Sequence, residues 1–359
     1  MSQGFPGQQW QGAGPAWGQP QGGPAPSGQF GGGQFGGGQF GGGQFPGGGP
    51  APKRRSPVPL IVGALAVVAL AMIGLGLYSV LGGPDYQNDD YVPPPPGDVK
   101  PFPDAEVSEV DMLLTANPLY SQQLATPIRC DLSIPDLNLE TASDADVKTY
   151  IDDLMACNMR VWDQPFRGTN RFELVRPVVN VYHDSVSTPC GGGERMGPNA
   201  AYCPANQQVY YSRKIHELHP NLAIMTQPHV IDEVMAHEFG HAMQGRTLIL
   251  QANYYQQRQG DRQAALELSR RAEVQADCFA GMYLQAVAES VGYTQSDIDT
   301  IMESVRLGGD DNLRNRPDDP GVLGDHGHGA SRLYWHQVGL TSTDIGSCNT
   351  FTAPAEHVR

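Results

Sequence analysis

One uninterrupted apolar run divides this chain into parts that must fold in different surroundings. Leu60–Leu81 reads LIVGALAVVALAMIGLGLYSVL, which is 22 residues without a charged side chain. At 1.5 Å per residue in a helix, such a run spans the hydrocarbon core of a bilayer, which is about 30 Å thick. A cleaved signal peptide is the alternative, but its apolar region is usually shorter and lies near the N-terminus. The run therefore predicts a single transmembrane helix within residues 56–82.

Charged residues are distributed unequally on the two sides of this run. Lys53, Arg54 and Arg55 precede it, and no acidic residue occurs before Asp85. The positive-inside rule therefore predicts a cytoplasmic N-terminus, with everything after Gly82 outside the cell membrane. Of the 23 Lys and Arg, removing these three leaves 20 after Asp85, against 38 Asp and Glu. This acidic balance excludes a nucleic-acid-binding protein that relies on bulk charge, because phosphate contacts need a cationic surface.

Residues 1–55 are rich in Gly, Gln and Pro and repeat Gly-Gly-Gly-Gln-Phe, with phenylalanines at a period of five. Such a segment cannot bury enough apolar surface to offset the entropy lost on ordering. We interpret it as a disordered cytoplasmic tail that acts as a flexible tether. The alternative is that the evenly spaced aromatic side chains bind partners weakly.

Residues 83–103 contain Pro93–Pro96, which predicts an extended linker that holds the following domain away from the bilayer. Residues 104–359 then form one domain, which is long enough for a sizeable core. Apolar spacing predicts helices over Glu106–Leu114 and Ala145–Cys157, and alternation predicts strands over Leu174–His183 and Gln208–Ser212. Helical patterns dominate after residue 228. The expected fold class is α+β, predominantly helical, with a small antiparallel sheet.

A short motif at the start of the helical half carries the chemistry. Residues 235–243 read Met-Ala-His-Glu-Phe-Gly-His-Ala-Met. His237 and His241 are four residues apart, so on a helix their rings project from one face and can bind one metal ion. Glu238 lies about 100° further round the helix, where it can reach a metal-bound water rather than the metal itself. Apolar residues fill the opposite face, which predicts a helix that packs against the core.

A catalytic zinc site with an open coordination position needs a third protein ligand. The metzincin pattern HExxHxxGxxH is excluded, because Gln244 and Thr247 stand where it requires Gly and His. The gluzincin pattern takes a glutamate from a later helix, and Glu273, with Asp277 one turn further on, is suitable. Asp277 could then accept the free ring N–H of a zinc-bound histidine and fix its orientation. The alternative is that both acids lie on a solvated helix face. Small residues beside them would let this helix approach the histidine helix closely: Ala276, Ala280 and Gly281.

Several further blocks of sequence, in one order, make the chain from about Cys190 to Phe351 resemble the bacterial neutral zinc metallopeptidase family, a group of membrane-anchored zincins. The resemblance implies a zincin-like fold, one zinc ion per chain held by His237, His241 and Glu273, and Glu238 as general base. The blocks are Pro189–Gly191, Gly197–Pro198, Tyr202–Pro204, Val209–Tyr210, His237–His241, Glu273–Gly281, Gly309–Asp311, His326–Gly327, Arg332, Trp335, Gly339–Leu340 and Cys348.

Metal chemistry then indicates how such a site would work. Zinc lowers the pKa of its water toward about 7, and Glu238 takes the proton and later passes it to the leaving amine. A second donor should stabilise the oxyanion, and His326 is the candidate, with His328 as a weaker one. A capping or structural role for His326 is equally consistent with the sequence. Gln208–Ser212 is either an edge strand that pairs with an extended substrate or part of a structural hairpin.

All six cysteines follow the apolar run, which favours disulfides in an oxidising compartment. Proximity together with the family resemblance pairs Cys130 with Cys157, Cys190 with Cys203, and Cys278 with Cys348. A zinc cluster built from cysteines is disfavoured, since no CxxC spacing occurs.

The leading hypothesis is a membrane-anchored zinc peptidase that acts on peptides or proteins outside the cytoplasm. One alternative is an inactive zincin-like domain that binds a partner in the cell envelope, although such a domain would not need Glu238. Another is an amidohydrolase that acts on cell-wall peptides. The sequence indicates no oligomeric state.

Overall fold

The computed structural model describes residues 84–97, 99–135, 137–319, 321–322 and 324–359. The predicted cytoplasmic tail and transmembrane helix lie outside these ranges. Among the helices that are described, none has the length and apolar character needed to cross a bilayer. The described residues from Pro84 to Arg359 belong to one compact unit.

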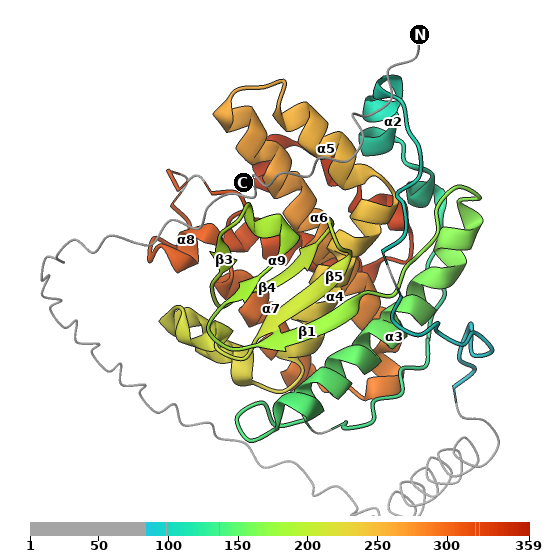
Figure 1. The fold of residues 1–359 in the computed structure, drawn as a ribbon, viewed down its shortest axis with the longest axis vertical. Coiled ribbons are helices and arrows are strands. Elements are labelled where there is room, and N and C mark those ends of the chain that lie inside the picture. The colour runs from blue at the N-terminus through green and yellow to red at the C-terminus, as the bar shows by residue number, and fades with distance from the viewer. Residues whose placement is uncertain (1–83, 98, 136, 320, 323) are drawn as a thin grey trace, which may run out of the picture. The chain divides into compact units, whose positions relative to one another are not determined.

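Helices form most of the regular structure, as the sequence predicts, and the larger of two small sheets lies on one face of them (Figure 1). The helices are α2 (Val110–Thr115), α3 (Asp144–Gly168), α4 (Val230–Arg246), α5 (Ile249–Gln257), α6 (Arg262–Val291), α7 (Gln295–Leu307), α8 (Asp310–Leu313) and α9 (Gly329–Thr341). The strands are β1 (Val178–Tyr182), β2 (Val186–Ser187), β3 (Arg195–Met196), β4 (Ala200–Cys203) and β5 (Gln208–Ser212).

The larger sheet has three strands in the order β1-β5-β4. β5 pairs antiparallel with β4 and parallel with β1, where Val178 lies opposite Gln208 and Tyr182 opposite Ser212. The prediction of an antiparallel sheet is therefore wrong for the β1–β5 pair. The chain between β1 and β5 includes a separate β2–β3 hairpin and β4, so it is long enough for the crossover that a parallel pair requires. β5 is central and pairs antiparallel with β4, so the structural hairpin is the correct interpretation of Gln208–Ser212 and the edge strand is wrong.

The first long helix, α3, covers the β1 side of the sheet (Figure 1). It begins with a capping box in which Ser143 and Asp146 satisfy each other's backbone N–H groups. The predicted helix ended at Cys157, but α3 continues to Gly168. Its later turns still bury large apolar side chains, and the Trp162 ring packs edge-on against Phe279 of α6 at 5.6 Å between centroids. Burial of these turns explains the longer helix.

Three helices in the second half of the chain cross at very short distances. A Cβ on Gly240 of α4 would lie 3.1 Å from the Cα of Ala276 in α6. On the other side of α6, a Cβ on Gly281 would lie 2.2 Å from the backbone oxygen of His336 in α9. Ala276 thus provides the predicted close approach to the histidine helix, whereas Gly281 packs against α9 instead. Side chains here are small because backbone packs directly on backbone.

A buried carboxylate fixes the start of α4. Asp232 is fully buried in the first turn of α4 and accepts hydrogen bonds from the Tyr150 hydroxyl at 2.7 Å and the Tyr293 hydroxyl at 2.9 Å. The His229 Nδ1 atom lies 3.0 Å from the same carboxylate. These partners come from α3 and from the α6–α7 connection, so α4 is anchored at the end that precedes its histidines.

Within the predicted spacer, residues 84–97 and 99–103 belong to the compact unit and contact the rest of the domain. Gln87 donates its backbone N–H to Pro127, the Asn88 side chain donates to the Arg160 backbone oxygen, and Gly97 donates to Arg176. The compact unit thus includes the described residues from Pro84 onward, which precede the start expected near Asp104. The polyproline stretch lacks internal hydrogen bonds, so its backbone groups are available to pair with the domain.

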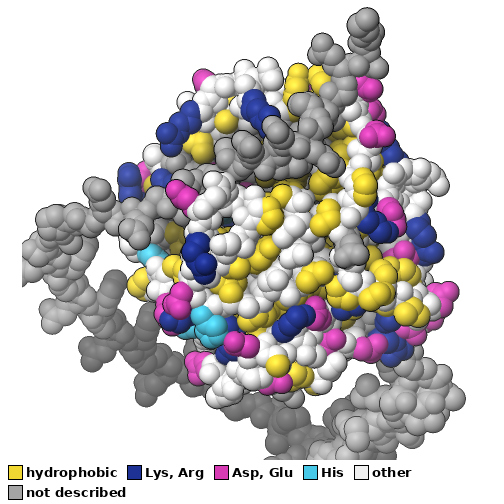
Figure 2. Space-filling view, viewed as in Figure 1, with side chains coloured by type: hydrophobic (Ala, Val, Ile, Leu, Met, Phe, Trp, Pro, Cys, Tyr) yellow, Lys and Arg dark blue, Asp and Glu magenta, His cyan; other side chains and the backbone are white. Residues whose placement is uncertain are grey.

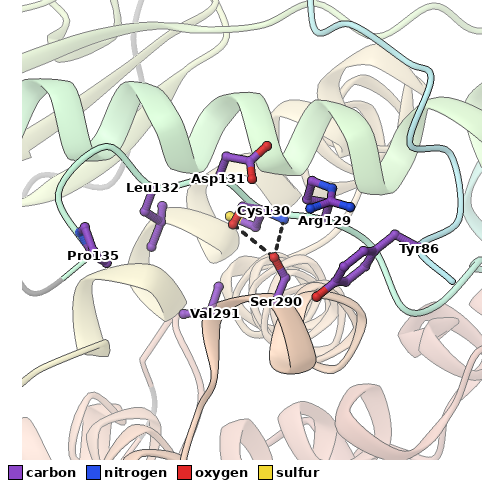
Figure 3. Close-up of a pocket in the computed structure, with 8 residues that line it drawn as sticks. All are labelled: Tyr86, Arg129, Cys130, Asp131, Leu132, Pro135, Ser290 and Val291. Carbon is purple, nitrogen blue, oxygen red and sulfur yellow. Dashed lines mark hydrogen bonds between the residues drawn. The ribbon is translucent and has the colours of Figure 1, made fainter. Parts of the chain in front are cut away.

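The same segment borders a surface hollow of about 310 Å³ (Figure 3). Tyr86 stacks under the Arg129 guanidinium on one side of it, and Ser290 at the end of α6 exchanges hydrogen bonds with the backbone of Cys130. Its lining includes none of the residues that the sequence predicts for the metal site.

The three predicted disulfides are confirmed, namely Cys130–Cys157, Cys190–Cys203 and Cys278–Cys348. The third joins α6 to the segment after α9, across a sequence separation of 70 residues. On the face shown in Figure 2, Lys and Arg side chains are interspersed with Asp and Glu and form no continuous basic patch.

Candidate metal centre

The two histidines of α4 and one glutamate of α6 meet where the helices cross. The Nε2 atom of His237 lies 3.4 Å from Oε2 of Glu273, and Nε2 of His241 lies 3.6 Å from Oε1 of the same carboxylate. The two imidazole rings are nearly perpendicular, with centroids 4.7 Å apart. The side chains of His237, His241 and Glu273 are 9%, 15% and 20% exposed, so the cluster is shielded but remains open to solvent. The structure therefore brings together the three predicted ligands.

The other ring nitrogen of His237 is held by Asp277. Nδ1 lies 2.8 Å from Oδ1 of Asp277, whose side chain is fully buried. Burial alone would raise the pKa of the Asp277 carboxyl, but Arg332 and His237 hold this pKa well below its usual range. A carboxylate can only accept, so Nδ1 of His237 carries a hydrogen, and Nε2, which faces Glu273, is the nitrogen left to bind a metal ion.

His241 is oriented by an amide that sequence analysis did not assign. Its Nδ1 atom lies 2.8 Å from Oε1 of Gln244. The Gln244 amide nitrogen donates to the backbone oxygen of Ala272 at 2.7 Å, which fixes which end of the amide faces the ring. His241 must then donate from Nδ1, and its Nε2, which also faces Glu273, is the nitrogen left to bind a metal ion. The sequence contains a signal for this contact, because His241 and Gln244 are three residues apart and such residues are neighbours on a helix.

These donors fit zinc. Two imidazole Nε2 atoms and one carboxylate are a three-ligand set that leaves a fourth position open. Glu273 is held as an anion, since burial would raise its pKa but His241 and His326 lower this pKa well below the usual value. Glu233, His237 and Asp277 form a second close group, but the Arg332 guanidinium contacts both oxygens of Asp277 and supplies the cation there.

Glu238 lies on the same helix and is oriented by the sheet. Its Oε2 atom accepts the backbone N–H of Tyr202 in β4 at 2.6 Å. β4 is an edge strand of the sheet, and α4 packs against it. A backbone donor cannot be read from a side-chain pattern, so this contact was not predicted.

His326 lies near Glu273 and is paired with Asp325. Its Nδ1 atom is 2.9 Å from Oδ1 of Asp325. Burial alone would lower the pKa of His326, but Glu273 and Asp325 raise it to about 9. The loop is shaped by Asp310, whose Oδ2 accepts the backbone N–H groups of His326 and Gly327. Asp310, one of the two acids in the Gly309–Asp311 block, therefore holds the backbone of the loop that carries His326.

His328, the weaker oxyanion candidate, is held elsewhere. Its Nε2 atom lies 2.7 Å from the backbone oxygen of Val322, and its side chain is buried. A ring nitrogen occupied in this way does not serve the metal centre.

Two further ionisable groups are buried behind the cluster. Burial raises the pKa of Glu233, one turn before His237, to about 7. Burial lowers the pKa of His336 in α9 to about 4, and neither of its ring nitrogens has a hydrogen-bond partner among the described residues. His336 is therefore a neutral imidazole inside the α6–α9 interface.

Comparison with known proteins finds relatives in other bacteria. The chain is 27% identical over 243 residues to "Uncharacterized protein YpfJ" of Escherichia coli (strain K12). The matched residues are 67% of this chain and 79% of that protein. It is 28% identical over 201 residues to "Uncharacterized protein Rv2575" of Mycobacterium tuberculosis (strain H37Rv), covering 50% and 63%. No solved structure matches.

A family match covers more than half of the chain. Residues 122–351 match the family described as "Putative neutral zinc metallopeptidase". This range includes His237, His241 and Glu273 and extends from before α3 into the segment that follows α9. The chain belongs to this neutral zinc metallopeptidase family.

Proposed function

We propose that the chain is a zinc-dependent peptidase with a zincin-like fold, and that His237, His241 and Glu273 hold one zinc ion. The observation that carries the proposal is the convergence of two Nε2 atoms, each on a ring whose Nδ1 is held by the protein, on both oxygens of one partly buried carboxylate. Glu238, on the same helix as the histidines, supplies a general base, which a purely structural metal site would not need. Membership of the family supports the same reaction class.

When bound, the zinc ion supplies a Lewis acid that polarises a carbonyl and acidifies water. Glu238 takes the proton of the attacking water and delivers it to the leaving amine. The Tyr202 N–H holds one oxygen of this carboxylate, so the base is positioned before substrate arrives. His326, with Nδ1 paired to Asp325, donates from its other ring nitrogen to the developing oxyanion.

The substrate is a peptide or protein in an extended conformation. β4 is the edge strand beside Glu238, so it replaces the predicted β5 as the strand with which a substrate backbone pairs.

The test uses Glu238→Gln in the chain from Pro84, where the compact unit begins. The amide oxygen of glutamine still accepts the Tyr202 N–H, so zinc content and folding should match the wild type. Hydrolysis of a quenched peptide library at neutral pH should fall by about 10² to 10⁴-fold, because an amide cannot take a proton from water. Glu303→Gln, which removes a carboxylate paired with Arg306 on α7, is the control and should keep full activity.

Two results would contradict the proposal. Equal turnover by wild type and Glu238→Gln would remove Glu238 from the reaction. Absence of turnover in both, with zinc bound, would favour the binding domain predicted as the alternative. Cleavage of cell-wall peptides alone would instead assign the amidohydrolase reaction.

The zinc ligands have their own test. Wild type should contain about one zinc per chain, and Glu273→Ala should lose it, because two histidines alone leave the site short of a ligand. Glu267→Ala is the control, since Glu267 lies on the same helix but pairs with Arg271. A full zinc complement in Glu273→Ala would mean that another acid is the ligand.

We also propose that Leu60–Leu81 anchors the peptidase in the cell membrane with the domain outside the cytoplasm. The three disulfides support an oxidising compartment. Protease added to intact cells should remove residues 84–359, and the domain should show no reactive thiol until it is reduced. Protection of the domain in intact cells would reverse this topology.

A further inference from the structure

We infer that Arg332 is a positioning residue of the metal centre, acting through Asp277 on His237. The inference rests on the proposed zinc site. It adds a component that lies on α9, outside the two helices that carry the ligands.

Arg332 meets Asp277 side-on with two hydrogen bonds. Its Nε atom donates to Oδ2 at 2.9 Å and its Nη2 atom to Oδ1 at 2.7 Å. The same Oδ1 accepts the Nδ1–H of His237 at 2.8 Å. One carboxylate therefore receives three donors, and the continuous series runs from Arg332 through Asp277 to His237.

The two-point contact with Arg332 orients the plane of the Asp277 carboxylate and stabilises its negative charge. A guanidinium is planar and presents its donors as a rigid fork, whereas a lysine ammonium is a single point. Without the fork, Asp277 could rotate about its last torsion and tilt the His237 ring with it. Because a ligating histidine is oriented by the group behind it, a change in that group changes metal affinity.

The surroundings hold Arg332 in this position. Its side chain is 13% exposed, and its third nitrogen, Nη1, donates to the Gly308 backbone oxygen at 3.1 Å. A Cβ on Gly308 would lie 2.9 Å from Nη1, so the glycine leaves room for the guanidinium. Arg332 lies in the first turn of α9, directly after the loop that carries His326. The same residue thus links that loop to the back of the zinc site.

The position of Asp277 explains why a cation is needed there. The carboxylate is fully buried on α6, and Glu233 lies in the same group of acids. The neighbouring His336 is neutral and supplies no charge. Two buried acids beside one imidazole require a fixed positive partner, and Arg332 is the arginine that contacts both oxygens of Asp277.

The test measures zinc affinity by competition with a chromophoric chelator, in the chain from Pro84, for Arg332→Met, Arg332→Lys and Asp277→Asn. Arg332→Met should bind zinc about tenfold more weakly than wild type, at the lower end of the 10 to 100-fold loss typical for groups behind a metal ligand. The zinc affinity of Arg332→Lys should lie between those of wild type and Arg332→Met, since lysine keeps the charge but not the planar fork of donors. Circular dichroism and thermal unfolding verify that each variant is folded.

Arg271→Met is the matched control. Arg271 is 11% exposed, pairs with the Glu267 carboxylate through two nitrogens and donates to the Thr350 and Ala353 backbone oxygens, but its acid partner does not contact a histidine. It should lose stability as Arg332→Met does and keep wild-type zinc affinity.

A double mutant separates positioning from general packing. If Arg332 acts through Asp277, adding Arg332→Met to Asp277→Asn should weaken zinc binding no further. The inference is overturned if folded Arg332→Met binds zinc like wild type, or if it weakens binding equally in the Asp277→Asn background. Should Arg332→Met not fold, Arg332→Lys replaces it in the same comparison. A wild type that binds no zinc would instead refute the proposed zinc site.

Discussion

Replacing Gly240 by alanine tests whether the crossing of α4 and α6 sets the geometry of the metal centre. Gly240 lies one residue before His241, and a Cβ there would be 3.1 Å from Cα, 3.2 Å from Cβ and 3.3 Å from the oxygen of Ala276. Contacts between such atoms are normally about 3.5 to 4.0 Å, so α6 must move by a few tenths of an ångström. Glu273, one turn earlier on α6, would move with it.

The expected magnitudes follow from this displacement. Alanine gains about 1 kcal/mol of helix propensity over glycine, but overpacking costs about 1 to 3 kcal/mol. The net loss of unfolding free energy is then about 0 to 2 kcal/mol. Zinc affinity should fall at least roughly tenfold, a larger effect than that on stability, because metal–ligand distances tolerate changes of only about ±0.2 Å.

Gly245→Ala, on the same helix, is the control. A Cβ at Gly245 would meet Tyr202 and Phe102 ring atoms at 3.5 to 3.6 Å, which is ordinary contact. This variant should gain about 1 kcal/mol of stability and keep its zinc affinity. Thermal unfolding and chelator competition measure both properties. If Gly240→Ala behaves like Gly245→Ala in both assays, the close helix crossing does not determine the ligand geometry.

Other properties of the domain can be tested in the same way. His336 has a pKa of about 4 when folded and about 6.5 when unfolded, so its stabilising effect is present above pH 6.5 and is lost as the pH falls toward 4. Wild type should lose about 2 kcal/mol more than His336→Leu between pH 7 and 5 in urea unfolding, and parallel curves would contradict this. The Cys278–Cys348 bridge closes 70 residues, so replacing both cysteines by alanine should cost about 4 kcal/mol in the same experiment, and an unchanged midpoint would refute it.

Helix periodicity predicts most of the metal centre. His237, His241, Glu273 and Asp277 occupy positions four apart within their helices, and one-turn spacing forces each pair onto one face. Gln244 was considered only as a departure from the metzincin pattern, although its spacing from His241 allowed the observed contact. The N–H of Tyr202 that orients Glu238 comes from the backbone, so no side-chain pattern reports it.

The fold was predicted less completely than the site. Alternation located β5 correctly, but strand order depends on which segments pair across long connections, and local sequence does not record that choice. The proline-rich segment was predicted as a spacer because its composition resembles that of linkers. Its pairing with distant backbone groups, such as that of Gly97 with Arg176, is a tertiary contact without a local signal.

The fixed tautomers of His237 and His241 bear on when zinc enters the protein. Asp277 and Gln244 orient the rings through protein contacts alone, so the entropy of ordering these side chains is lost during folding and not on metal binding. Zinc fingers behave differently, because their ligands become ordered only with the metal. At the proposed zinc site we therefore expect folding to precede loading, and we expect zinc to stabilise the native state by mass action, by about 4 kcal/mol at a free concentration a thousand times Kd. Chelation should therefore yield a folded, inactive protein that regains its metal without refolding.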